Sequence, residues 1–186
     1  MKRPSEILSG LRPETGSKFP CRFDRRTRRI TPAVVAVIAG GFILLQHLSN
    51  GGYVSAWFLA FAIAILGLYI LSIPRHLKVT ERAVEIICVL ETTEVEIPDI
   101  ASVRRLEDRR RIVPLLGSYG FFGYYGYYFD MKSWESVKVY AGNWSDAVEI
   151  VDIFEQRYIV STPEAEKFIA AVEEAMENYR SESEKM

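Results

Sequence analysis

The sequence lacks charge over a long internal stretch. No Asp, Glu, Lys or Arg occurs among the 44 residues from Thr31 to Pro74. Such a run is too long for one strand or one core helix, but it matches two membrane-spanning helices joined by a turn. The apolar segments 31–49 and 53–73 would each span roughly 27–31 Å as helices, about the thickness of the hydrocarbon layer. A buried helical hairpin in a soluble protein is the less favoured alternative, because neither segment carries a polar stripe.

The charges that flank this stretch predict its orientation. Residues 1–30 contain nine Lys or Arg against three Asp or Glu, and Arg75 and Lys78 follow the second apolar segment. The positive-inside rule then places both termini in the cytoplasm, with two crossings of the cell (inner or plasma) membrane. The basic run from Arg22 to Arg29 also has the composition to attract anionic lipid headgroups.

The residues that usually carry chemistry are scarce. There are only two histidines, His47 and His76, and two cysteines, Cys21 and Cys88, which form no CxxC pair. The sequence contains no GxSxG motif, no phosphate-binding Walker loop and no metal-ligand spacing. We therefore expect no enzyme activity, no cofactor and no metal. The net charge of −1 gives no general attraction to nucleic acid.

After the charge-free stretch the pattern changes to short alternating runs separated by polar turns, which is typical of an antiparallel sandwich or small barrel. These runs are LKV (77–79), AVEIICVL (83–90), EVEI (94–97), SVRRLED (102–108), VKVYA (137–141), AVEIVDIF (147–154) and RYIVS (157–161). A final helix is expected after an N-cap at Ser161 or Thr162, with one apolar face. The predicted division is a basic cytoplasmic segment (1–30), a transmembrane hairpin (31–74), a cytoplasmic domain (75–180) and a disordered tail (181–186).

The order of motifs in this domain resembles the bacterial pleckstrin-homology (PH-like) domain family, in the type that follows two membrane spans. The matching stretches are LKVTERAVEI, VEIPDIASVRR, LLGSYGFFGYYGYYF, VKVYAGNW and YIVSTPEAEKFIAAV, within about residues 75–176. The resemblance implies an α+β protein in which a two-helix transmembrane hairpin precedes a PH-like antiparallel seven-stranded barrel or sandwich, capped by a C-terminal helix. It implies no reaction.

The stretch GSYGFFGYYGYYF (117–129) has glycine at every third position among aromatic residues. Glycine inside strands marks bends, bulges or close backbone approach, so Gly117, Gly120, Gly123 and Gly126 are expected to be structural. We expect a loop over 117–122 and a bent strand over 123–131. Two interpretations of the rings remain open: they fill the core, or they form a surface for a partner or for the membrane interface. The candidate contacts are Tyr119, Phe121, Phe122, Tyr124 and Tyr125.

Arg109, Arg110 and Arg111 precede this stretch and could bind phosphate groups or acidic partners. A solvated charged hairpin is the simpler interpretation. The first functional hypothesis is a membrane-anchored, non-catalytic interaction module that binds a partner protein or a second copy of itself. The alternatives are a module that senses anionic lipid headgroups, or an accessory subunit of a membrane enzyme or transporter.

Overall fold

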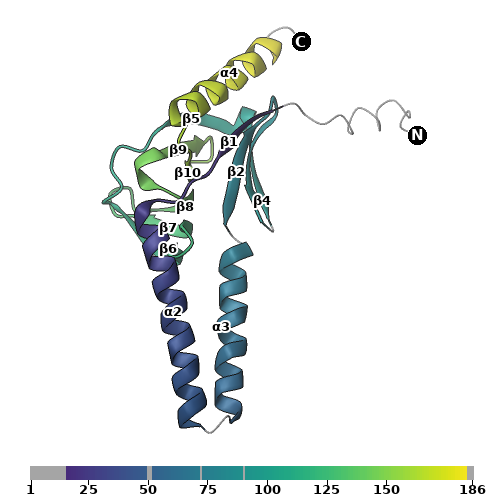
Figure 1. Cartoon of the computed structure of the whole chain (residues 1–186). Coiled ribbons are helices and arrows are strands. Elements are labelled where there is room, and N and C mark those ends of the chain that lie inside the picture. Colours follow the sequence, from purple (N-terminus) through teal and green to yellow (C-terminus); the bar gives the residue numbers. More distant parts are fainter. Residues whose placement is uncertain (1–15, 50–51, 72, 90, 184–186) are drawn as a thin grey trace, which may run out of the picture.

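The N-terminal part of the chain forms a strand that leads into a helical hairpin. A computed structural model describes residues 16–49, 52–71, 73–89 and 91–183. Strand β1 (Ser17–Pro20) is followed by α2 (Arg25–Leu48), and α3 (Tyr53–Leu71) runs back alongside α2. The two helices project together from the β-rich part of the molecule (Figure 1).

The β-rich part consists of two sheets. The first has the order β1-β2-β3-β4 and is antiparallel, with β2 (Pro74–Val79), β3 (Ala83–Cys88) and β4 (Thr92–Glu96). The short 3₁₀ helix η1 (Ile97–Asp99) leads into the second sheet, which has the order β5-β9-β10-β8-β7-β6. Its elements are β5 (Ile100–Arg105), β6 (Ile112–Tyr119), β7 (Tyr124–Asp130), β8 (Glu135–Ala141), the 3₁₀ helix η2 (Trp144–Asp146), β9 (Ala147–Asp152) and β10 (Arg157–Ser161).

The prediction of a seven-stranded antiparallel barrel or sandwich was wrong in the number of strands and in the direction of one strand pair. The described residues form ten strands in two separate sheets, and they do not close into a barrel. One pair, β8 and β10, is parallel, because β10 forms a hairpin with β9 and then lies along β8 in the same direction. Strand β1 comes from the segment predicted to precede the hairpin, and it pairs with β2 from Ser17↔Val79 to Pro20↔His76.

The predicted C-terminal helix is confirmed as α4 (Ala165–Ser183), which covers the end of the two sheets remote from the hairpin (Figure 1). Phe168 and Val172 of α4 are fully buried in a core cluster to which both sheets contribute. The ring of Phe168 meets that of Phe19 edge to face, with centroids 5.3 Å apart, so β1 and α4 complete one core. Residues 181–183 belong to α4 rather than to a tail; the rest of the predicted tail lies outside the described residues.

Helix α2 starts six residues earlier than predicted. Asp24 acts as its N-cap, since Oδ1 accepts the N–H of Thr27 at 2.6 Å, and Pro32 therefore lies inside the helix. By length and composition, α2 is the one described helix that meets the requirements for crossing a bilayer, and residues Tyr53–Leu68 of α3 form a shorter apolar segment.

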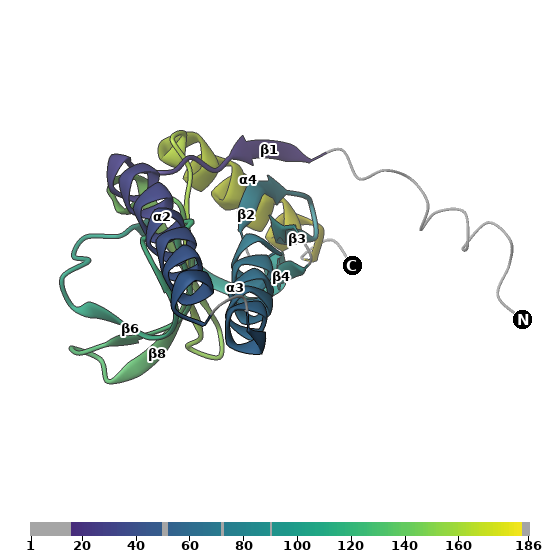
Figure 2. The same cartoon turned by 60° about the horizontal axis from the view of Figure 1, so that its bottom comes forward.

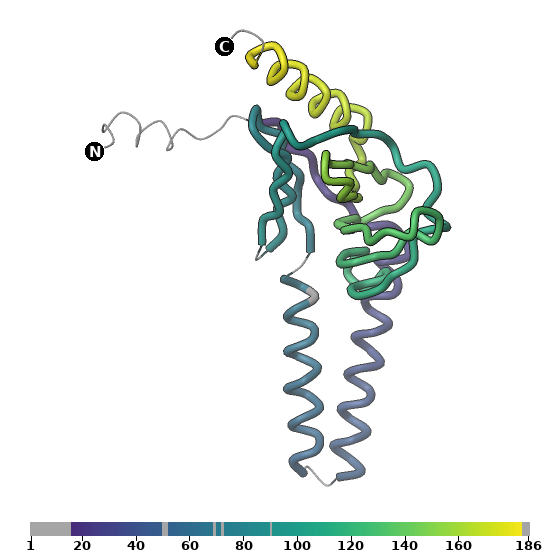
Figure 3. The backbone as a smooth tube through the Cα atoms, turned by 180° about the vertical axis from the view of Figure 1, so that it is seen from behind, coloured from purple at the N-terminus to yellow at the C-terminus, as the bar shows by residue number. Residues whose placement is uncertain are grey.

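The hairpin connects two different sheets. Helix α3 leads into β2 of the first sheet, whereas the start of α2 lies beside β6 and β7 of the second sheet (Figure 2 and Figure 3). Large apolar side chains are exposed along both helices, among them Val37, Trp57 and Phe61. Near the turn, Ser55 Oγ donates to Gln46 Oε1 at 2.6 Å and joins the two helices. The β-rich part is thus joined to the hairpin at two points: through β2, which follows α3, and through β6 and β7, which lie beside the start of α2.

Candidate interaction surfaces

The glycine-rich aromatic stretch forms the end of the β6–β7 hairpin and packs against the start of α2. The phenol of Tyr124 donates to Asp24 Oδ2 at 2.9 Å, and the N–H of Phe122 donates to Thr31 Oγ1 at 3.0 Å. The guanidinium of Arg26 lies 5.3 Å from the centre of the Tyr119 ring, a cation–π contact. This stretch therefore holds the second sheet on the first turns of α2.

The candidate aromatic residues differ sharply in exposure. Tyr124 and Tyr125 are buried, at 1% and 6% exposure, so they cannot contact a partner without rearrangement. Phe121 and Phe122 are half-buried, and their ring centroids lie 4.7 Å apart. Tyr119 is 47% exposed. Most of these rings thus serve packing, and Tyr119 is the most accessible member of the set.

The glycines permit close approach of the two strands. Gly117 and Gly126 are paired across β6 and β7, and both have positive φ, at 140° and 113°. A Cβ on Gly117 would lie 2.1 Å from the Tyr125 carbonyl oxygen, and one on Gly126 would lie 2.3 Å from the Leu116 oxygen. Gly120 and Gly123 also have positive φ and shape the turn. Strand β6 continues to Tyr119, so the predicted loop over 117–122 was too long at its start.

The structure divides the three candidate arginines. Arg109 and Arg110 are exposed and line a pocket of about 220 Å³ together with Arg26 and Tyr119. Arg111 is half-buried and lies near Asp130, whose pKa its charge helps to lower. Arg26 belongs to the basic run that was predicted separately to attract lipid headgroups, and the structure brings it beside Arg109 and Arg110.

A second surface, which the sequence analysis missed, lies at the other end of the second sheet. The β7–β8 turn presents Trp134 and the β9–β10 turn presents Phe154, with 79% and 75% of these residues exposed. Exposed Ile153 and Met131 flank them. The two turns are neighbours, because Arg157 at the start of β10 pairs with Val137 near the start of β8. We call these four residues the Trp134–Phe154 surface.

Both turns are fixed by carboxylates that accept backbone hydrogen bonds. Asp130 Oδ1 accepts the N–H of Lys132 at 2.9 Å. Asp152 Oδ1 accepts the N–H of Phe154 at 2.9 Å and that of Gln156 at 2.8 Å. Trp134 itself takes a positive φ of 59°, a conformation that the turn imposes on it. The exposed aromatic rings therefore stand on ordered turns.

A buried ion-pair network lies beneath the Trp134–Phe154 surface. The guanidinium of Arg157 donates to Asp130 Oδ2 at 2.6 Å, to Glu149 Oε1 at 2.7 Å through Nε, and to Ser133 Oγ at 3.1 Å. Arg104 binds the other oxygen of Glu149 at 2.8 Å. Burial tends to raise the pKa of Asp130, but the hydrogen bonds and charges around it outweigh burial, so its pKa is lowered. Arg157 thus links β7, β9 and the β7–β8 turn.

The sequence does contain a signal for these turns. Aspartate ends both strands, at Asp130 and Asp152, and Asp side chains favour turns in which they bond the backbone two residues on. The exposure of the following aromatic residues could not be derived from this signal. Alternation in AVEIVDIF, for instance, is equally compatible with a strand that continues through Phe154.

Among the described residues, no group of three His, Cys, Asp or Glu side chains is arranged to hold a metal ion. Two sheets capped at one end by a C-terminal helix are the architecture of a PH-like domain. A family model described as bacterial PH domain matches residues 75–176, more than half of the 186-residue chain, so the protein belongs to the bacterial PH domain family. No significant match was found among curated proteins or solved structures. PH-like domains are generally interaction modules without catalytic activity.

Proposed function

We propose that this protein is a non-catalytic PH-domain module that is anchored in the membrane by α2 and α3 and binds a partner protein through the Trp134–Phe154 surface. The observation that carries the proposal is the presentation of two exposed aromatic residues on adjacent ordered turns. Asp130 and Arg157 fix the turn that carries Trp134, and Asp152 fixes the turn that carries Phe154. Exposed aromatic residues held on ordered turns are typical hot-spot residues of protein–protein interfaces, where a few side chains contribute most of the binding free energy.

Anchoring by both helices is supported by their surface. The hairpin carries no Asp, Glu, Lys or Arg after Arg29, and its apolar side chains point outward rather than into the domain. Helix α3 has 19 residues and is roughly 28 Å long, close to the thickness of the hydrocarbon layer. The basic first turn of α2 and Arg75 at the start of β2 would then lie on the cytoplasmic side.

The anchor leaves the Trp134–Phe154 surface accessible. Strand β7 runs from Tyr124, beside α2, to Asp130, just before the turn that carries Trp134. The surface therefore lies a full strand length from the start of α2. A partner in the cytoplasm, or a second copy of the chain, can reach it without entering the bilayer.

The experiment is a comparison of proteins that co-purify with tagged full-length chain from native membranes. The double variant Trp134→Ala/Phe154→Ala should lose a specific partner that wild type retains. Tyr179→Ala on α4 is the matched control, because Tyr179 is also exposed but lies elsewhere, and it should retain the partner. Equal recovery of every partner by the double variant would contradict the proposal. Loss of self-association alone would identify the partner as a second copy.

A contact with anionic lipid headgroups is a second candidate, favoured by the gathering of Arg26, Arg109 and Arg110 around one pocket beside the start of α2. Three cations at the level where α2 leaves the bilayer would pair with lipid phosphates. Arg109→Gln/Arg110→Gln should then lower photolabelling of residues 106–119 by phosphatidylglycerol, without changing partner recovery. Unchanged labelling would remove this candidate.

A further inference from the structure

A pocket opens between the two sheets at the end nearest the hairpin. It has a volume of about 490 Å³, which is within the range of sites that hold one small ligand. Its walls come from three places: the last turns of α3, the turn between β3 and β4, and the face of β7 and β8. Helix α4 covers the opposite end of the sheets, so the pocket lies at the end that α4 leaves open (Figure 1).

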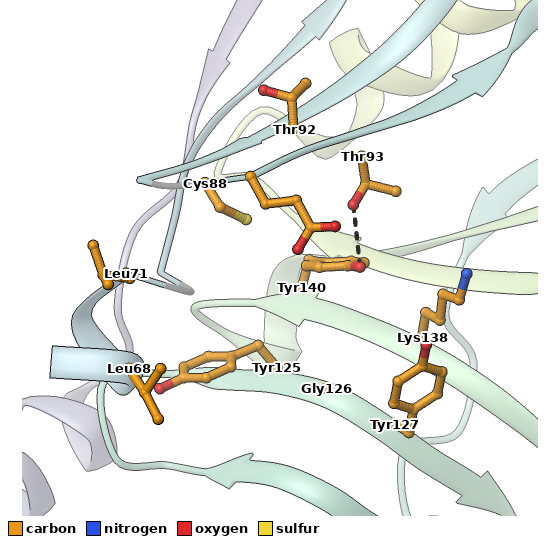
Figure 4. Close-up of a pocket in the computed structure, with 11 residues that line it drawn as sticks. Leu68, Leu71, Cys88, Thr92, Thr93, Tyr125, Gly126, Tyr127, Lys138 and Tyr140 are labelled. Carbon is orange, nitrogen blue, oxygen red and sulfur yellow. Dashed lines mark hydrogen bonds between the residues drawn. The ribbon is translucent and has the colours of Figure 1, made fainter. Parts of the chain in front are cut away.

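The pocket has an apolar side and a polar side. Leu68 and Leu71 of α3 line one side, next to Tyr125, whereas Lys138 lies on the other (Figure 4). Between them, Thr93 Oγ1 donates to the Tyr140 hydroxyl at 3.2 Å, a bond that links the first sheet to the second. A ligand in this pocket would therefore need a hydrocarbon part toward α3 and a polar part toward β8.

The charged side chains that line the pocket determine which polar headgroup of a ligand it can bind. The pocket holds one cation, Lys138, and one anion, Glu91. Among the described residues Lys138 forms no ion pair, and its ammonium lies 5.3 Å from the centre of the Tyr158 ring. A headgroup with several phosphates would need several cations, whereas a zwitterion presents one charge of each sign. The lining thus matches a phosphate at Lys138 and an ammonium at Glu91.

We propose that this pocket binds the headgroup of a zwitterionic membrane phospholipid, whose acyl chains leave past Leu68 and Leu71 along α3. The inference rests on the proposed crossing of the bilayer by α3, which brings the end of that helix to the level of the lipid headgroups. It concerns a different site from the arginine pocket beside α2, because it is lined by other residues on the other helix.

The test is photolabelling of full-length protein in nanodiscs that contain phosphatidylethanolamine with a diazirine on the acyl chain close to the ester. Labelled peptides are identified by mass spectrometry. We expect labels on residues 88–93 and 125–140 as well as on the hairpin. Excess unlabelled phosphatidylethanolamine should compete at the pocket, and phosphatidylglycerol should not. Labelling of the hairpin alone, or equal competition by phosphatidylglycerol, would overturn the inference.

Lys138→Gln is the decisive variant, and Lys132→Gln, an exposed lysine in the β7–β8 turn, is its control. Loss of one charge-assisted contact should lower pocket labelling by about tenfold or more in Lys138→Gln and leave Lys132→Gln unchanged. Hairpin labelling should be the same in both. Equal pocket labelling in the two variants would refute the site, whereas absence of label on residues 25–48 and 53–71 would refute the proposed anchoring instead.

Discussion

The phenol of Tyr124 and the carboxylate of Asp24 form a hydrogen bond of 2.9 Å between β7 and the start of α2. The other oxygen of Asp24 accepts the N–H of Thr27, so a single carboxylate both caps α2 and holds the second sheet. The two residues are 100 positions apart in the chain. The family match begins at residue 75, so this contact joins the matched domain to a segment that lies outside the match.

Tyr124→Phe should weaken this junction. The substitution leaves Asp24 Oδ2 without its donor, and loss of a hydrogen bond to a charged group costs about 1.5–3 kcal/mol. The melting temperature of the detergent-solubilised protein, followed by tryptophan fluorescence, should fall. Tyr119→Phe is the control, because the Tyr119 ring is half exposed, and it should melt like wild type. A Tyr124→Phe variant as stable as wild type would show that the bond contributes little.

The same variant should change the response to alkaline pH. Burial, together with the hydrogen bond to Asp24, raises the pKa of Tyr124 from 10.0 to about 12. A raised pKa means that the folded protein favours the protonated phenol. The resulting stability is complete below pH 10 and is lost as the pH rises toward about 12. The loss of stability over this range should be smaller in Tyr124→Phe than in wild type; identical pH profiles would contradict this assignment.

Gly117→Ala and Gly126→Ala should each be strongly destabilising. Both positions combine a positive φ with a Cβ position less than 2.5 Å from a backbone carbonyl oxygen of the neighbouring strand. The backbone must shift, and we expect a loss of about 3 kcal/mol or more, measured as a lower melting temperature. Gly40→Ala is the control, since a Cβ at Gly40 meets nothing within 4 Å. Comparable melting of all three variants would argue against the close strand approach.

Arg157→Met should destabilise the protein by about 3–5 kcal/mol, because it leaves the buried carboxylate of Asp130 without its guanidinium partner and leaves Glu149 paired with Arg104 alone. Arg105→Met is the control: Arg105 pairs with Glu166 at the surface, where an ion pair contributes about 0–1 kcal/mol. Adding Asp130→Asn and Glu149→Gln to Arg157→Met should restore part of the lost stability. If neutralising these partners has no effect, unpaired charge is not the cause.

The network also predicts acid sensitivity. Because the pKa of Asp130 is lowered in the folded protein, its contribution is present above the ordinary value of 3.8 and is lost as the pH falls below it. Urea unfolding as a function of pH should show a smaller acid loss for Asp130→Asn than for wild type. An unchanged acid profile would mean that Asp130 titrates normally.

The proposed topology can be tested with single cysteines. Ser49→Cys lies at the turn end of α2, and Ser145→Cys lies on the β-rich part. In intact cells a membrane-impermeant maleimide should label only Ser49→Cys, and Ser145→Cys should react after permeabilisation. The native thiols of Cys21 and Cys88 should not react with the maleimide, because only a thiolate reacts and burial keeps both thiols protonated. Burial raises the pKa of Cys21 to about 12 and that of Cys88 to about 11. Labelling of both positions in intact cells would exclude this orientation.

The sequence predicted those elements whose pattern is local. Apolar residues without charge specify the two hairpin helices, and the spacing of Phe168, Ile169 and Val172 specifies one buried face of α4. The short 3₁₀ helix η1 lies within VEIPDIASVRR, one of the stretches that carried the family resemblance. By contrast, SKFP (17–20) is too short to show a period, so β1 was not predicted.

The candidate site was less predictable than the fold. Aromatic composition alone drew attention to residues 119–125, of which Tyr124 and Tyr125 are buried. Trp134 and Phe154 can be recognised as a surface only in the folded structure, because their exposure depends on which strands lie beside β8 and β10. Exposure is a property of the assembled sheet and is not encoded in the few residues around a ring.

By itself, the sequence determined where the chain is apolar, where it alternates and where it must bend, because these depend on side chains within a few positions of one another. The tertiary structure decided that Asp24 meets Tyr124, that Arg157 joins β9 to the β7–β8 turn, and that a pocket opens beside Leu68 and Leu71. Those contacts join residues far apart in the chain. They follow from the order of the strands, which is set by the free energy of packing the whole domain.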